Sequence, residues 1–375
     1  MPEDEKRTDV VTLFLCGDVM TGRGIDQILR HPSGPGLYEP YVRDARRYVD
    51  IAEQINGPID YPVDFDYIWG DALPELERVA PDVRIVNLET AVTASEGHWP
   101  GKGIHYRMHP ANVPCLAAAG LDCCSLANNH TLDWGYAGLE ETLSVLHGAD
   151  IFTAGAGRNR REAQAPAVLD AGRGRRVLVF GLGSATSGIP ASWAASGERP
   201  GVNLLPDLSP QTARGVGAQM RKLRRPADIV VASVHWGENW GYEIPDTQRR
   251  FAHALIDAGA DIVHGHSSHH VKGIEVYGGK LILYGCGDFL TDYEGIEGYE
   301  HYRDDLGLMY FATIDVASGS LRTLHMTPTR IERFRLHRAR PEEVRWLRAV
   351  LDREGKALGT RAVPAEGGTL KLQWA

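Results

Sequence analysis

Long apolar runs are absent from this sequence. No stretch approaches the roughly 20 residues that a membrane-spanning helix needs. The run VVTLFLC (residues 10–16) is shorter than most signal-peptide cores, and it leads directly into a polar motif at Asp18. These features predict a cytoplasmic protein that has no membrane partner.

Positive charge is also scarce. The chain has 40 Lys and Arg against 49 Asp and Glu, which gives a formal net charge of −9. Nucleic-acid-binding domains are typically basic, so we expect no nucleic-acid partner. Two short basic clusters, at residues 173–176 and 221–225, precede apolar runs. Their position favours solvated helix ends or loops over an anion-binding site.

Two further signatures are missing. The five cysteines include no CxxC pair, which favours reduced core thiols over disulfides or a zinc site. The Gly-rich run GLGSATSG (residues 181–188) lacks the lysine of a P-loop, so nucleotide binding is only weakly indicated.

Apolar runs of strand length alternate with helical patterns along the chain. This alternation indicates a layered α/β fold. A hairpin-like pair of runs around Gly278-Gly279 suggests that part of the sheet is antiparallel. We expect one domain over residues 1–330, followed by a C-terminal helix and a loosely attached tail over 331–375.

Polar motifs follow the apolar runs at the points where the strands should end. In order they are Gly17-Asp18, Asn87-Leu88-Glu89, Asn128-Asn129-His130, His235-Trp236-Gly237-Glu238, Gly265-His266-Ser267-Ser268-His269-His270 and Gly287-Asp288. Open α/β sheets place their ligands outside the carboxyl ends of the strands. Six such motifs predict one polar crevice.

The side chains in these motifs are those that divalent metals bind. Carboxylates, amide oxygens and imidazoles ligate Mn²⁺, Zn²⁺ and Fe²⁺, while the carboxylates and amide oxygens also suit Ca²⁺ and Mg²⁺. The candidate ligands are Asp18, Glu89, Asn129, His235, His266 and His269. The sequence therefore predicts a site for one or two divalent metal ions, and it sets no oligomeric state.

The order of these motifs resembles that of the CapA-like family, which is named for poly-γ-glutamate capsule synthesis. That family is similar to the calcineurin-like metallophosphoesterases, whose fold is a four-layer αββα sandwich with mixed sheets. The resemblance covers roughly residues 10–316. It implies metal ligation by the six residues named above, with His130 beside the metals.

Two positions depart from the metallophosphoesterase pattern. Those enzymes begin with Asp-x-His, whereas this chain has Asp18-Val19-Met20, and a thioether is a poor ligand for hard metals. Glu89 stands where they have a bridging aspartate. These departures favour a single metal ion, or one tightly bound and one weakly bound ion. They argue against the pair of metal ions that drives phosphoryl hydrolysis.

Some soluble CapA-like proteins resemble the epimerases of lasso-peptide pathways, which invert the Cα of a ribosomal peptide's terminal residue. Such a reaction needs a metal that polarises the carboxylate, together with an acid and a base on opposite faces of the carbon. His301, in the polar loop 293–305, is one candidate. Asp18 is the other if it is not tightly ligated, and His130 is the next in line.

The predicted partner is accordingly a peptide. Trp134 and Trp236 are candidates to pack its terminal residue, and Arg107 is a candidate to pair its carboxylate. The alternative is a metallophosphoesterase that hydrolyses a phosphoester through metal-bound hydroxide, with His130 protonating the leaving group. A third class is a non-catalytic binding module that keeps one structural metal.

Overall fold

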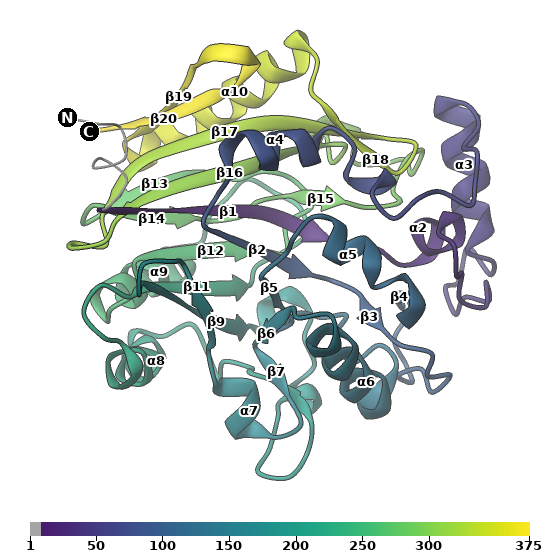
Figure 1. The fold of residues 1–375 in the computed structure, drawn as a ribbon, viewed down its shortest axis with the longest axis horizontal. Coiled ribbons are helices and arrows are strands. Elements are labelled where there is room, and N and C mark those ends of the chain that lie inside the picture. Colours follow the sequence, from purple (N-terminus) through teal and green to yellow (C-terminus); the bar gives the residue numbers. More distant parts are fainter. Residues whose placement is uncertain (1–8) are drawn as a thin grey trace.

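The computed structural model describes residues 9–375, and within them the chain forms two large mixed sheets (Figure 1). The first sheet runs in the order β19 (Thr360–Pro364), β20 (Leu370–Trp374), β17 (Leu321–Glu332), β16 (Leu306–Asp315), β1 (Val10–Val19), β2 (Val83–Leu88), β5 (Cys123–Ser125), β6 (Phe152–Ala154). Two short strands, β15 (Asp288–Leu290) and β18 (Arg335–Arg338), pair with β1 and β17.

The second sheet runs in the order β13 (Ile274–Tyr277), β14 (Lys280–Leu283), β12 (Ile262–His266), β11 (Ile229–His235), β9 (Arg176–Gly183), β8 (Ala167–Asp170). Two small ribbons accompany the sheets, namely β10 (Gly201–Val202) with β7 (Ala156–Gly157) and β3 (Ala91–Val92) with β4 (Arg107–Met108). Parallel and antiparallel pairs occur in both large sheets, as the hairpin at Gly278-Gly279 led us to expect.

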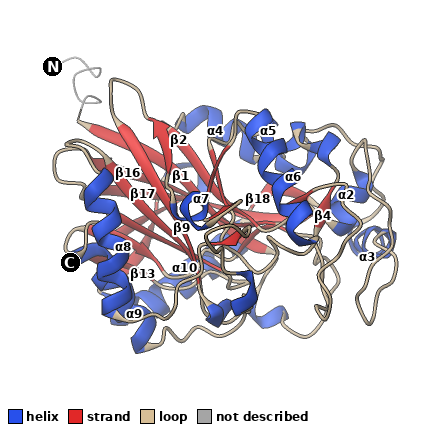
Figure 2. Cartoon of the chain, turned by 90° about the horizontal axis from the view of Figure 1, so that it is seen from below, coloured by secondary structure: helices blue, strands red, loops and turns tan. Residues whose placement is uncertain are grey.

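Helices cover the outer faces of both sheets, with α4, α5 and α6 on one side and α8 and α9 on the other (Figure 2). The helices are α2 (Arg23–Ile28), α3 (Arg46–Asn56), α4 (Ala72–Val79), α5 (Pro114–Ala118), α6 (Gly135–Gly148), α7 (Arg160–Gln164), α8 (Pro210–Leu223), α9 (Asp246–Asp257) and α10 (Pro341–Gly355). None of the described helices is both long and apolar enough to cross a membrane.

Apolar side chains on both faces of the strands hold the layers together. In β1, Leu13 and Leu15 face the second sheet, while Phe14 packs on the helix side. In β11, Val231 lies in the core between the sheets, and Val230 packs under α8 and α9. Strands buried on both faces read as continuous apolar runs, which is why they stood out in the sequence. The expected four-layer α/β/β/α architecture is confirmed.

The C-terminal segment is more firmly attached than expected. Strand β17 spans the boundary that we placed at residue 330, and β20 pairs with it, so the last residues extend the first sheet. Leu347 and Leu351 of α10 are buried in the core between the sheets, together with Leu370. Burial of these side chains anchors a segment that we had interpreted as a loose tail.

Candidate metal centre

The carboxyl ends of strands from both sheets meet at one place, as the strand-end motifs predicted. Asp18 at the end of β1 lies in register with Asn87 of β2 and with Asp288 of β15. In the second sheet, His235 at the end of β11 lies in register with His266 of β12. The backbone N–H of Ser267 donates to Asp18 Oδ2 at 3.2 Å and so joins the two sheets at this point.

A close approach of two glycines brings Asp18 and Asp288 together. A Cβ atom on Gly17 would lie 1.7 Å from the carbonyl oxygen of Gly287, so no other residue fits there without moving a strand. Gly287 itself has a φ of +76°, which favours glycine. The two Gly-Asp motifs therefore work as a pair, because the glycines permit the contact that positions the carboxylates.

We expect Gly17→Ala to destabilise the fold by more than about 3 kcal/mol, because the overlap is with backbone rather than with a flexible side chain. Gly215 in α8 is a matched control, since a Cβ there meets nothing within 4 Å. Gly215→Ala should stabilise the protein by about 0.5–1 kcal/mol through helix propensity. Chemical denaturation measures both changes, and a tolerated Gly17→Ala would contradict the close approach.

Three donor groups lie close enough to share one metal ion. Ligand atoms of Asp18, His235 and His266 all lie within 4.8 Å of one another, and all three side chains are buried. The Nδ1 atoms of the two histidines are 2.8 Å apart, and Nε2 of His266 lies 2.8 Å from the Ser233 hydroxyl. Burial lowers the pKa of both imidazoles. Both rings are therefore neutral, which is the form that binds metals.

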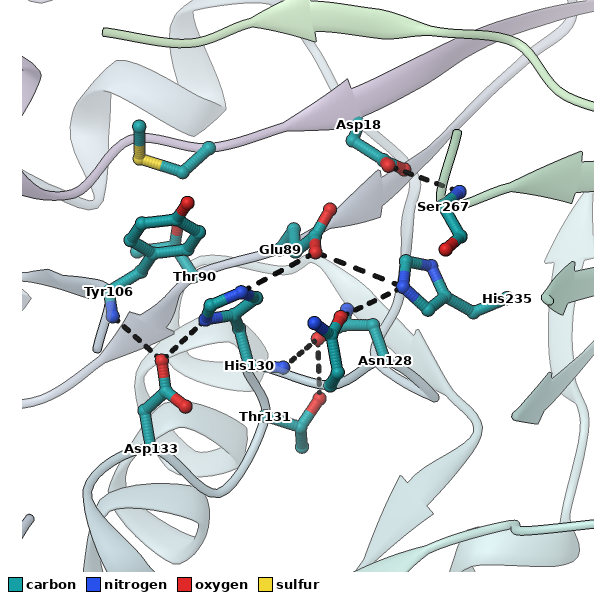
Figure 3. Close-up of polar contacts among 12 residues, drawn as sticks. Asp18, Glu89, Thr90, Tyr106, Asn128, His130, Thr131, Asp133, His235 and Ser267 are labelled. Carbon is teal, nitrogen blue, oxygen red and sulfur yellow. Dashed lines mark hydrogen bonds and ion pairs between the residues drawn. The ribbon is translucent and has the colours of Figure 1, made fainter. Parts of the chain in front are cut away.

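Two more predicted ligands lie on the other side of the His235 ring. Its Nε2 atom is 2.9 Å from Asn129 Oδ1 and 3.8 Å from Glu89 Oε1. Glu89 points into the space between His235 and His130, and its Oε1 is 3.7 Å from His130 Nε2 (Figure 3). The structure thus brings Asp18, Glu89, Asn129, His235 and His266 into one continuous cluster.

The charge balance of this cluster fits a divalent cation. Burial, together with the nearby Asp288 carboxylate, raises the pKa of Asp18 to about 7. Burial and the Asp18 carboxylate also raise the pKa of Glu89 well above its ordinary value. Buried carboxylates that disfavour each other's ionised form are stabilised by a metal ion between them. The residues present therefore fit the metal that the sequence motifs imply.

Met20 takes no part in this donor set. Its sulfur accepts a hydrogen bond from the backbone N–H of Gly22 at 3.1 Å, and the side chain is 2% exposed. The residue that replaces the histidine of the Asp-x-His motif is thus turned toward its own backbone. This geometry agrees with our expectation that Met20 does not substitute for an imidazole ligand.

His130 is held by a carboxylate and an ammonium group. Its Nδ1 atom is 2.6 Å from Asp133 Oδ2 and 3.0 Å from Lys102 Nζ, and Lys102 and Asp133 form an ion pair. Burial lowers the pKa of His130 to about 4. The Tyr106 ring stacks on the imidazole at 3.9 Å between centroids. The Nε2 atom is therefore left facing Glu89.

His269 forms a second imidazole–carboxylate pair. Its Nδ1 atom is 3.0 Å from Asp288 Oδ1, and this carboxylate raises the pKa of His269 although burial opposes the shift. The Tyr293 ring lies edge-on to the imidazole at 5.3 Å, and the Tyr293 hydroxyl is 2.5 Å from the Tyr106 hydroxyl. The two tyrosines link His130 to His269 across the site.

The structure does not bring His301 into this cluster. His301 lies in a short 3-10 turn (Glu300–Tyr302), its side chain is exposed, and its ring packs against Tyr302. The polar loop does approach the site, but through Tyr293 and through Asp304, whose pKa is raised to about 7 by burial and by Asp288. Residues of this loop other than His301 therefore face the site, and a role of His301 in proton transfer stays a prediction.

The residues that we predicted to bind substrate lie in two different places. Trp236 is 1% exposed, and its indole N–H donates to the Tyr284 carbonyl within the core beneath α9. Arg107 lies 3.9 Å over the Trp134 ring and pairs with the exposed Glu96. Arg107 and Trp134 are themselves buried, and the Trp134 indole N–H donates to the Tyr106 carbonyl. Sequence reasoning missed Asp133 and Tyr293. Asp133 could have been found from the sequence, because it lies three residues after His130.

The fold and the cluster define an α/β sandwich protein with a candidate centre of carboxylate, amide and imidazole donors for a divalent metal. The chain belongs to the family of bacterial capsule synthesis proteins described as PGA_cap, which its residues 12–293 match. The resemblance to the CapA-like family is therefore confirmed. The resemblance to the lasso-peptide epimerases stays a prediction.

Two curated relatives illustrate the range of the family. A probable polyglutamine synthesis accessory protein of Mycobacterium tuberculosis is 49% identical over 365 residues, which cover 97% of this chain and 96% of the relative. The capsule biosynthesis protein CapA of Bacillus anthracis is 27% identical over 314 residues, which cover 82% of this chain and 66% of CapA. Among solved structures, a 5'-nucleotidase precursor from Thermus thermophilus matches with a TM-score of 0.46 and 14% identity, covering 89% of this chain and 55% of that chain.

Proposed function

We propose that this chain is a metal-dependent peptide epimerase that inverts the Cα of the C-terminal residue of a ribosomal, lasso-type precursor peptide. The relatives are named for polyglutamine and capsule synthesis, and polyglutamine is itself a chain of amino-acid residues. A peptide-like substrate is therefore compatible with the family. The reaction is suggested by the number and placement of the groups that can move protons.

The observation that carries the proposal is the presence of two imidazole–carboxylate pairs at one metal-type cluster. His130 and Asp133 are buried, and the buried Asp288 pairs with His269, whose side chain is 13% exposed. The Tyr106–Tyr293 hydroxyl contact connects the two pairs. Hydrolysis needs one proton donor beside the metal, whereas inversion at carbon needs a proton-accepting group on one face and a proton-donating group on the other.

A divalent metal held by Asp18, His235 and His266, with Glu89 and Asn129 adjacent, would act as a Lewis acid toward the substrate's terminal carboxylate. His130 is neutral and its Nε2 is unprotonated when Nδ1–H donates to Asp133, so it is the base that removes the Cα proton. His269, next to Asp288, returns a proton from the other side. In this assignment Asp18 is a ligand, and His269 takes the role that the sequence suggested for His301.

The test is deuterium uptake by peptides incubated with protein and Mn²⁺ in D₂O. A panel of pentapeptides that end in different residues, including glutamine, is read by mass spectrometry and by chiral analysis of the terminal residue. We expect one deuteron to be gained at the terminal residue, together with inversion and without backbone cleavage. No uptake from any peptide by a metal-loaded protein, combined with steady phosphoester hydrolysis, would refute the proposal.

Phosphoester hydrolysis is the second candidate, and the position of Glu89 favours it. Its Oε1 lies within 4 Å of both His130 Nε2 and His235 Nε2, as expected for a carboxylate at the centre of a hydrolytic site. Here His130 would protonate the leaving group. This candidate predicts phosphate release from p-nitrophenyl phosphate that depends on His130 and is insensitive to His269→Gln.

A further inference from the structure

Residues from both basic clusters, which we interpreted as solvated helix ends or loops, line one groove together with two arginines of α7. It lies beside α7, the β8–β9 hairpin and the end of α8, and it has a volume of about 900 Å³. Its cationic lining residues are Arg160, Arg161, Arg176, Lys222, Arg224 and Arg225, and its lining includes no Asp or Glu. This concentration of positive charge is unexpected in a protein with a net charge of −9.

Only some of these cations are neutralised by partners. Arg176 pairs with Asp228 and Arg224 pairs with Asp261. The side chains of Arg161, Lys222 and Arg225 are exposed and have no ion pair among the described residues. The groove therefore keeps an excess of positive charge that faces solvent.

The groove surface between the cations is apolar. Leu178 of β9 is buried there, and the neighbouring Val168 and Leu223 are unusually exposed at 41% and 44%. No aromatic side chain lines the groove. A ligand that fits this surface carries several negative charges and also presents short apolar stems.

This groove is separate from the metal centre. Arg176 and Leu178 lie at the beginning of β9, whereas Gly183 at its end is in register with His235. Seven residue steps along a strand place the two sites about 23 Å apart. A ligand in this groove would therefore bind apart from the metal centre and its proposed reaction.

We propose that this groove binds an acidic segment of a polypeptide. Side chains of Glu and Asp in an extended chain offer carboxylates to the guanidinium and ammonium groups, and their methylene groups pack on Val168, Leu178 and Leu223. The cations are spread over three elements rather than converging on one point. A single phosphate group would contact only some of them, whereas an extended acidic chain can contact several at once.

Other polyanions match the surface less well. Single-stranded nucleic acids bind on aromatic platforms, which this groove lacks. An anionic membrane is flat and contacts protruding basic and apolar side chains, whereas these side chains line a hollow. The groove geometry therefore points to a flexible acidic chain.

The test is fluorescence anisotropy of fluorescein-labelled decaglutamate titrated with the full-length protein at low ionic strength. We expect saturable binding that weakens as salt is added. The triple variant Arg161→Glu, Lys222→Glu, Arg225→Glu should weaken binding by about tenfold or more. All three positions are exposed, so the variant should fold like the parent, with only a small fall in melting temperature because Lys222→Glu places a negative charge in the last turn of α8.

A charge-matched control separates local binding from net charge. Arg214, Arg250 and Arg345 are exposed and lie outside the groove lining, so their triple replacement by Glu makes the same charge change elsewhere. The control should lose much less affinity than the groove variant. Equal losses in both would overturn the proposal, as would tighter binding to a single-stranded DNA decamer or to anionic phosphatidylserine vesicles than to decaglutamate.

Discussion

Asp18→Asn should raise the stability of the metal-free protein at pH 8 while weakening divalent-metal binding by more than about 100-fold. The loss of binding follows because Asp18 is a donor of the cluster, and even residues behind such donors contribute about 10- to 100-fold to metal affinity. The gain in stability follows because a buried carboxylate beside Asp288 is costly to ionise when no cation is present.

The sign of the pH dependence follows from the direction of the shift. The pKa of Asp18 rises from 3.8 to about 7 on folding. The folded state therefore binds the proton more tightly, and stability is lost as pH rises from about 4 to about 7. The shift corresponds to a penalty of about 4 kcal/mol at pH 8, which already includes the hydrogen bond from Asn87. The backbone N–H of Ser267 also donates to this carboxylate. Because Asn keeps only part of these bonds, the net gain should be about 2 kcal/mol.

Chemical denaturation of the chelator-treated protein between pH 5 and pH 8 measures the free energy of unfolding. Calorimetric titration with Mn²⁺ measures the affinity for the metal. Asp66→Asn is the matched control, because Asp66 is exposed and lies outside the cluster. It should change neither quantity. If Asp18→Asn bound Mn²⁺ as tightly as the parent, Asp18 would not be a ligand.

Residues at strand ends were predictable from the sequence because strand position fixes where their side chains meet. β1, β2, β11 and β12 are buried on both faces, so their apolar runs mark where each strand stops. The polar residue that follows then lies at a shared sheet edge. Asp18, Glu89, His235 and His266 were therefore predictable as neighbours from the sequence alone.

Loop residues were not predictable in the same way. The loop after β15 reaches the site because Arg23 pairs with Asp292 and contacts both the Tyr106 and the Tyr293 rings. Nothing in the local pattern of residues 293–305 distinguishes Tyr293 from His301, since the choice depends on a contact with Arg23, which is far away in the sequence. The C-terminal strands β19 and β20 were also missed. They pair with each other as a hairpin, but that hairpin joins the first sheet through β20, which pairs with the distant strand β17.

His130→Gln should lower both deuterium exchange and inversion at Cα by about 10²- to 10⁴-fold, with metal stoichiometry unchanged. The imidazole faces Glu89 but is not one of the three closest donors, so the metal should remain bound. Asp133→Asn should cause a smaller loss, because Asp133 holds the ring in the tautomer whose Nε2 is free. Calorimetry with Mn²⁺ and the D₂O assay give the two readouts.

The comparison with His269→Gln separates proton removal from inversion. If His130 removes the proton and His269 supplies the other face, a protein without His269 still exchanges the Cα proton with D₂O through His130 and returns it to the same side. We therefore expect His269→Gln to retain exchange and lose inversion, and His130→Gln to lose both. Exposed His301 supplies the control, since His301→Ala should leave both signals intact. If His301→Ala alone abolished inversion, the loop would have to close over the site during turnover, and the second proton carrier would be His301 rather than His269.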